Sequence, residues 1–271
     1  MHHDERPVAF FDSGVGGLPY LAAARRRMPA ERYVYLADRA GFPYGTKTKE
    51  QVVALATGAV AALVARIDPK AVVVACNTAT ELAIDEIRAA NPGLAIVGTV
   101  PAIKPAAALS SKRRIGVVAT QAAASAAYLT NLAGAWAADC ALVKIGDGAL
   151  VDFVEHSYLA ATPEQRQEAV RPSVSAMLEQ GVDVIVLGCT HFLHLANEFR
   201  EVAGDSAIIV DSSDGIASRL ATILGYTENS TTPGSNRADK DCMYLTGQRE
   251  PEPVYRGFAS LFGLTMAGSI A

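Results

Sequence analysis

Short, uninterrupted aliphatic runs alternate along the chain with longer segments of helical pattern. The runs predict strands at residues 8–11, 33–36, 71–76, 95–97, 115–119, 141–145, 184–187 and 208–210. Helical patterns lie between most of them, for example at residues 49–66, 81–90, 163–180 and 215–224. Continuous aliphatic runs suit strands that are buried on both faces of a parallel sheet. The alternation therefore predicts a doubly wound α/β architecture.

Two changes of pattern predict a division into domains. After residue 98 the chain runs through a charged cluster directly into a new aliphatic strand, and a second switch follows Val210. The simplest arrangement is two similar α/β domains, the first made of residues 1–98 and 211–271 and the second of residues 99–210. The polar stretch from 225 to 256 predicts a loop with one edge strand at 242–245.

Two of the predicted strands lead to a cysteine that is followed by hydrogen-bonding side chains. The two sequences are Cys76-Asn77-Thr78 and Cys189-Thr190-His191. In parallel α/β sheets, ligands bind beyond the carboxyl ends of the strands. We therefore expect the two thiols to face one cleft.

The surroundings of these cysteines predict acid/base chemistry. A capping box from Thr78 to Glu81 predicts a helix N-terminus directly after Cys76, which would lower the pKa of its thiol. A thiolate can remove a proton from a substrate carbon while a second thiol delivers one to the opposite face, which inverts the stereocentre. The carbanion-like transition state then needs amides and hydroxyls around the adjacent carboxylate.

A glycine-rich turn follows the first predicted strand. Asp12 and Ser13 open it, and the glycines within residues 14–17 let backbone amides approach an anion near a helix N-terminus. Pro19 stands where a dinucleotide fingerprint would need its third glycine, so that fingerprint is absent. The turn predicts anion or substrate binding.

Composition and charge exclude several classes of protein. With 24 Lys+Arg against 28 Asp+Glu the net charge is −4. The sequence has no basic stripe of the kind that binds nucleic acid, so we expect no nucleic-acid partner. The N-terminus has no apolar signal segment, and no apolar run approaches the roughly 18 to 20 residues of a membrane span, so we expect a cytoplasmic protein without a membrane partner. The four scattered cysteines form no C-x-x-C pair, which argues against disulfides and a cysteine-rich metal site.

Taken in order, the motifs resemble the glutamate racemases of the aspartate/glutamate racemase family over nearly the whole chain. The segments that carry the resemblance are residues 12–18, 43–45, 75–80, 100–106, 188–191 and 211–212. The resemblance implies an isomerase that makes D-glutamate from L-glutamate for peptidoglycan synthesis, and thus for cell-wall biogenesis and cell shape. It further implies two pseudo-symmetric α/β domains with the active site between them, no cofactor or metal, and a homodimer.

The resemblance also implies roles for individual residues. Cys76 and Cys189 would be the two acid/base thiols, with Asp12 and His191 as helpers. The residues expected around the glutamate substrate are Asp12, Ser13, Pro43, Tyr44, Gly45, Asn77, Thr78, Thr120 and Thr190, with Asp38 as a further candidate.

The chain departs from the family at two places. Phe192 is followed by Leu193, where the family usually has proline after an aromatic residue. The family also often carries a glutamate near the end of the strand after Cys140, for which Asp147 is the nearest candidate and Glu155 lies in a poorer register.

Three alternatives stay open at this point. An aspartate racemase or related two-cysteine isomerase is the nearest, although the Asp12-Ser13 opening favours glutamate. A cysteine hydrolase would use Cys189 as nucleophile and His191 as base, and a binding protein would retain only the fold. The second thiol argues against both of these.

Overall fold

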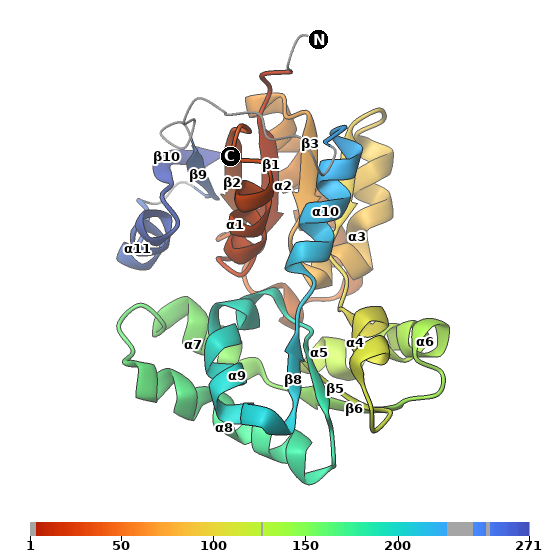
Figure 1. Ribbon diagram of the computed structural model, residues 1–271. Coiled ribbons are helices and arrows are strands. Elements are labelled where there is room, and N and C mark those ends of the chain that lie inside the picture. Colours follow the sequence, from red (N-terminus) through yellow and green to blue (C-terminus); the bar gives the residue numbers. More distant parts are fainter. Residues whose placement is uncertain (1–3, 126, 227–240, 248–249, 271) are drawn as a thin grey trace. The chain divides into compact units, whose positions relative to one another are not determined.

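The computed structural model describes residues 4–125, 127–226, 241–247 and 250–270 (Figure 1). The chain forms two compact units, Met1–Thr99 with Ser213–Ala271, and Val100–Ser212. The division predicted from the sequence, after residues 98 and 210, falls close to these limits. That each unit is a separate folding domain stays a prediction.

Unit 1 contains a six-stranded parallel sheet with β1 and its two neighbours at the centre. The strands are β1 (Val8–Asp12), β2 (Tyr33–Ala37), β3 (Ala71–Val74), β4 (Ala95–Gly98), β9 (Cys242–Thr246) and β10 (Thr265–Ile270), in the order β10-β9-β2-β1-β3-β4. Phe10 of β1 lies opposite Tyr35 of β2 and Val73 of β3. The predicted edge strand at 242–245 was wrong in its position, because β9 lies between β2 and β10.

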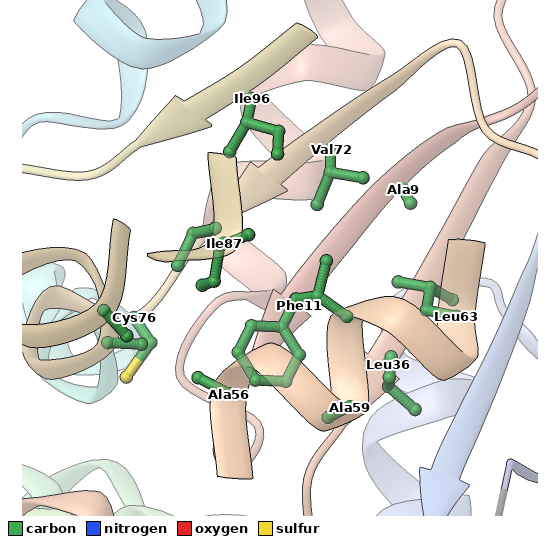
Figure 2. Packing of buried hydrophobic residues seen from close by; sticks show 14 of the residues in the cluster. Ala9, Phe11, Leu36, Ala56, Ala59, Leu63, Val72, Cys76, Ile87 and Ile96 are labelled. Carbon is green, nitrogen blue, oxygen red and sulfur yellow. The ribbon is translucent and has the colours of Figure 1, made fainter. Parts of the chain in front are cut away.

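Helices cover both faces of this sheet. They are α1 (Leu18–Arg27), α2 (Lys49–Ile67), α3 (Asn77–Ala90), α10 (Ser213–Ile223) and α11 (Pro253–Leu261), with a short 3-10 helix η1 (Tyr44–Thr46). In Figure 1, α1 and α10 lie side by side in front of the strands. Alternate residues of the strands, such as Phe11 and Val72, pack on α2 and α3, and Figure 2 shows this core with Cys76 among its members.

The helix α2 matches a membrane span by length and composition, which the sequence analysis did not anticipate. Within the described ranges it is the one helix that does so. Its buried residues, among them Val52, Val60 and Leu63, belong to the core shared with the central strands. Packing against the sheet therefore accounts for the buried face of α2, while only 22% of its apolar window is buried.

Unit 2 contains a four-stranded parallel sheet. Its strands are β5 (Arg114–Ala119), β6 (Ala141–Gly146), β7 (Val184–Leu187) and β8 (Ile208–Val210), in the order β6-β5-β7-β8. Its helices are α4 (Ile103–Leu109), α5 (Gln121–Ser125), α6 (Ala127–Trp136), α7 (Gly148–His156), α8 (Pro163–Glu179) and α9 (Ala196–Ala203), with the 3-10 helices η2 (Thr190–Leu195) and η3 (Gly204–Ser206).

The two sheets repeat one topology. In unit 1 the order β2-β1-β3-β4 corresponds strand by strand to β6-β5-β7-β8 in unit 2. In each, the chain reverses its direction of winding at the first strand, and such switch points are where α/β sheets bind ligands. Cys76 lies at the second position after β3, and Cys189 at the second position after β7. The predicted fold, with two related parallel sheets, is confirmed.

Candidate active site

Cys76 lies between the end of β3 and the first turn of α3. The predicted helix N-terminus directly after Cys76 is confirmed, because α3 begins at Asn77, but the predicted capping box at Thr78 was wrong, because Cys76 itself occupies the capping position. The Thr80 hydroxyl instead donates to the carbonyl of Val74 (3.1 Å) and accepts from the amide of Thr99 (3.1 Å). Thr80 therefore fixes the first turn of α3 to the ends of β3 and β4.

The glycine-rich turn after β1 is held against the segment that leads to Cys76. The Tyr35 hydroxyl donates to the carbonyl of Gly14 (2.8 Å) and accepts from the amide of Gly17 (3.0 Å). A Cβ atom at Gly17 would lie 2.7 Å from the Cβ of Ala75, so only glycine fits there. Ligand binding by this turn stays a prediction.

A chain of polar contacts joins Cys76 to Asp12, the last residue of β1. The Ser13 hydroxyl lies 3.8 Å from the Cys76 sulfur and donates to Asp12 Oδ1 (3.1 Å), which also accepts from the amide of Gly14 (3.1 Å). The Asp12 side chain is fully buried. Unit 1 therefore places a carboxylate one hydroxyl away from the first thiol.

Burial, followed by the negative charge of Asp12, raises the pKa of the Cys76 thiol well above its ordinary value. Hydrogen bonds from the amides of Ala79 and Ser13 act in the opposite direction but do not outweigh these causes. The expectation that the helix N-terminus lowers the pKa of Cys76 was therefore wrong. Both causes favour the protonated thiol of Cys76 over its thiolate.

Cys189 has a different neighbour. It follows β7, and Gly188 before it passes so close to Val117 and Val118 that a Cβ atom there would clash. His191 Nδ1 lies 3.8 Å from the Cys189 sulfur, and His191 Nε2 lies 2.7 Å from Glu155 Oε1 on α7. All three side chains are buried. They form a line of thiol, imidazole and carboxylate within unit 2.

The charges in this line favour an imidazolium. Burial alone would lower the pKa of His191, but hydrogen bonds with Cys189 and Glu155 and the negative charge of Glu155 raise the pKa well above 6.5. An imidazolium can donate to the Cys189 sulfur and stabilise negative charge on it. The two thiols thus have opposite electrostatic surroundings.

The structure brings Glu155, and not Asp147, to His191. Asp147 caps α7, where Oδ1 accepts from the amide of Leu150 (3.2 Å), and its Oδ2 accepts from the Ser173 hydroxyl (2.6 Å). The sequence ranking of these two residues was therefore reversed. The available signal was the position of Glu155 on the buried face of an amphipathic helix, where an unpaired charge would be costly.

The other predicted residues lie at the same edges of the two sheets. In unit 1, Pro43 and Gly45 flank the buried Tyr44, and Asn77 and Thr78 are half-buried in the first turn of α3. In unit 2, the Thr120 hydroxyl accepts from the amide of Ala123 (3.3 Å). Contact of these residues with substrate stays a prediction.

The departure from the family pattern at Leu193 leaves a regular backbone. Phe192 and Leu193 belong to the 3-10 helix η2, which continues directly into α9. Phe192 is fully buried, and His191 in the same helix is directed to Glu155. Among the residues that the structure describes, no group of His, Cys, Asp and Glu is arranged to hold a metal ion.

Comparison with known proteins identifies a family that the chain matches. Residues 20–218 match the model of the Asp/Glu/Hydantoin racemase family. The chain is 38% identical over 262 residues to glutamate racemase of Treponema pallidum subsp. pallidum, covering 96% of this chain and 95% of the relative. It is also 38% identical over 219 residues to glutamate racemase of Roseiflexus sp., covering 81% of this chain and 79% of the relative.

A solved structure agrees with these sequence matches. The crystal structure of Escherichia coli glutamate racemase in complex with L-glutamate and the activator UDP-MurNAc-ala superposes with a TM-score of 0.84 at 29% identity, covering 98% of both chains. The match includes the parallel sheets of both units. The chain therefore belongs to the Asp/Glu/Hydantoin racemase family and is an amino-acid racemase of the glutamate racemase type.

Proposed function

We propose that this racemase interconverts L- and D-glutamate with Cys76 and Cys189 as its two acid/base groups, acting on opposite faces of the substrate. The observation that carries the proposal is the opposite charge beside each thiol. Cys76 has the carboxylate of Asp12 behind Ser13, and Cys189 has the imidazole of His191 held by Glu155. Cys76 thereby has a neighbour that favours its protonated form, and Cys189 has an imidazolium that can donate a hydrogen bond to its sulfur.

The proton transfers follow from these charges. The Cys189 thiolate takes the α-proton, and the electron pair of the C–H bond remains on the α-carbon. The Cys76 thiol then delivers its proton to the other face, which forms the new C–H bond and leaves a thiolate on Cys76. In the reverse direction the two sulfurs exchange roles, with Asp12 and His191 accepting or returning protons.

Carboxylate recognition is the second requirement, because the α-carbon becomes acidic only when negative charge spreads into the adjacent carboxylate. Amides and hydroxyls at the sheet edges are suited to stabilise that charge. The candidates in unit 1 are Ser13, Asn77 and Thr78, and those in unit 2 are Thr120 and Thr190. Pro43, Tyr44 and Gly45 complete the proposed surroundings of the substrate.

The geometry around Cys189 taken alone also suits a cysteine hydrolase. Thiol, imidazole and carboxylate follow one another as in nucleophilic triads. Family membership decides against this alternative, and a hydrolase would have no use for a second thiol with its own carboxylate. We therefore assign the line of Cys189, His191 and Glu155 to proton transfer.

The activity itself is tested with the purified protein and either enantiomer of glutamate, without added cofactor. We expect both reactions to reach the same equal mixture, measured by chiral chromatography. Aspartate is the comparison substrate. We expect its kcat/KM to be about 100-fold lower than that of glutamate, since one missing methylene shortens the reach to the second carboxylate. A higher kcat/KM for aspartate would identify an aspartate racemase.

Replacing Glu155 by glutamine is expected to change the pH dependence. The variant loses a charge that raises the pKa of His191, so the imidazolium should give up its proton at lower pH. We expect the alkaline limb of kcat/KM to move toward pH 6.5 and activity near pH 8 to fall about tenfold. Glu164→Gln, on the exposed start of α8, is the control. An unmoved alkaline limb in Glu155→Gln would contradict this role.

The biological setting belongs to the same proposal. D-glutamate is a component of peptidoglycan, so the activity would serve cell-wall biogenesis and cell shape. A cytoplasmic location would keep Cys76 and Cys189 reduced. We also propose a homodimer, which sedimentation of the purified protein would test.

A further inference from the structure

The loop after β2 is joined to the C-terminal strand β9 through one buried carboxylate. Asp38 Oδ2 accepts a hydrogen bond from the Tyr44 hydroxyl (2.6 Å). Asp38 Oδ1 accepts from the Thr246 hydroxyl (2.5 Å) and from the amide of Gly41 (3.2 Å). The Asp38 side chain is only 3% exposed. Its oxygens are engaged within the protein, which argues against the direct substrate contact expected from the sequence.

Thr246, the last residue of β9, connects to this loop in two ways. Besides donating to Asp38, its hydroxyl accepts from the amide of Ala40 (3.0 Å). Arg39, the loop residue between Asp38 and Ala40, forms an ion pair with Glu252 (3.0 Å) on the chain that follows β9. Three successive loop residues, 38 to 40, are thereby attached to a segment that lies 206 to 213 positions further along the sequence.

Gly41 allows the carboxylate to lie inside the loop. A Cβ atom at this position would overlap Asp38 Oδ2 and contact the Tyr44 ring. A side chain at residue 41 would therefore displace Asp38 from its partners. The Asp38 carboxylate is therefore the reason that residue 41 is glycine. Backbone conformation is not the reason, because Gly41 does not lie in the left-handed region.

The position of Tyr44 matters because it lies near the first thiol. Tyr44 is buried in the apolar cluster that includes Phe11 and Cys76, and η1 packs on α3. Burial, then the charge of Asp38, raises the pKa of Tyr44, so the hydroxyl keeps its proton and donates a hydrogen bond to Asp38. Tyr44 is only 2% exposed, so its partly exposed neighbours Pro43 and Gly45 offer the loop's accessible surface to a substrate.

We propose that Asp38 and Thr246 are positioning residues, through which the end of β9 sets the place of the Pro43–Tyr44–Gly45 loop in the substrate site. The proposal rests on the proposed function, in which Cys76 acts on a substrate beside this loop. It assigns a role to Thr246, a residue outside every motif of the sequence. It also gives Asp38 the role of holding Tyr44 in place, instead of the direct contact with substrate that the sequence suggested.

The test compares Thr246→Val with Thr246→Ser in steady-state racemisation of both enantiomers. Valine keeps the shape of threonine but removes the hydroxyl, so we expect KM to rise about tenfold with kcat changed less than about threefold. Serine restores the hydroxyl and should restore KM. Thr265→Val, at the exposed start of the neighbouring strand β10, is the matched control and should retain the parent's constants.

The split between KM and kcat distinguishes positioning from loss of folded protein. Partial unfolding lowers apparent kcat and leaves KM unchanged, and that result in Thr246→Val would overturn the proposal, as would a KM equal to the parent's. Tyr44→Phe should raise KM to a similar degree, and the double variant should be no worse than the larger single effect, because both act through Asp38.

Two further outcomes distinguish a failure of this proposal from a failure of the proposed function. If Thr246→Val does not fold, Tyr44→Phe decides, and an unchanged KM in that variant overturns the proposal. Racemisation retained by Cys76→Ser would contradict the proposed function instead, whatever the behaviour of Thr246.

Discussion

Replacing either Cys76 or Cys189 by serine is expected to abolish racemisation in both directions. A serine hydroxyl is a far weaker acid than a thiol, so it does not ionise to the anion that is needed to take the α-proton. General acid/base groups contribute about 10²- to 10⁴-fold each, and we expect kcat/KM to fall by about 10³-fold or more. Initial rates with L- and D-glutamate, measured by circular dichroism, provide the comparison.

The loss must be equal in the two directions, even though each thiol acts on one face. The enantiomers have the same free energy in water, so kcat/KM for the two directions stays equal in every variant. Cys140→Ser and Cys242→Ser are the matched controls, because these thiols lie outside the two sites, and they should retain full activity. A serine variant at 76 or 189 with activity within about tenfold of the parent would remove that thiol from the mechanism.

Replacing Asp12 by asparagine is expected to have the next largest effect. Asparagine keeps the shape and an oxygen for Ser13 and Gly14 but removes the charge that helps to keep Cys76 protonated. It also removes the group that can accept the Cys76 proton through Ser13. We expect kcat/KM to fall about 10²- to 10³-fold in both directions, measured across a range of pH.

A buried aspartate outside the site controls for the loss of a charge. Asp241 is almost fully buried at the start of β9, where it pairs with Arg25 (2.7 Å) and accepts from the amide of Tyr33 (2.7 Å). Asp241→Asn should lower thermal stability and leave kcat/KM of the folded protein near the parent's. If Asp12→Asn behaved in the same way, Asp12 would be structural.

The central sheets could be predicted from the sequence because their strands are continuous aliphatic runs. The strand β10 was missed because it lies at an edge, and most of its residues are exposed and include glycine and serine. The start of helix α3 directly after Cys76 could be predicted, but the Thr78 capping box used for that prediction is not formed. Its first turn is fixed by Thr80 bonding to the neighbouring strand ends, a tertiary contact that local pattern does not contain.

The two candidate thiols could be found from sequence because each follows a buried strand directly. Their supporting residues were harder to identify, since the pairs are distant in the chain. Glu155 and His191 are separated by 36 positions, and Asp38 and Thr246 by 208. The direction of the Cys76 pKa shift was also inaccessible, because it depends on full burial and on the closeness of Asp12.

The claim that two different groups handle the proton is tested most directly by racemisation in heavy water. The parent protein is given L-glutamate in D₂O, and substrate and product are separated at low conversion and analysed by mass spectrometry. The account predicts that newly formed D-glutamate carries deuterium at the α-carbon while the remaining L-glutamate keeps its original hydrogen. Early product that retains the original hydrogen would show that one group both removes and returns the proton, and would contradict the account.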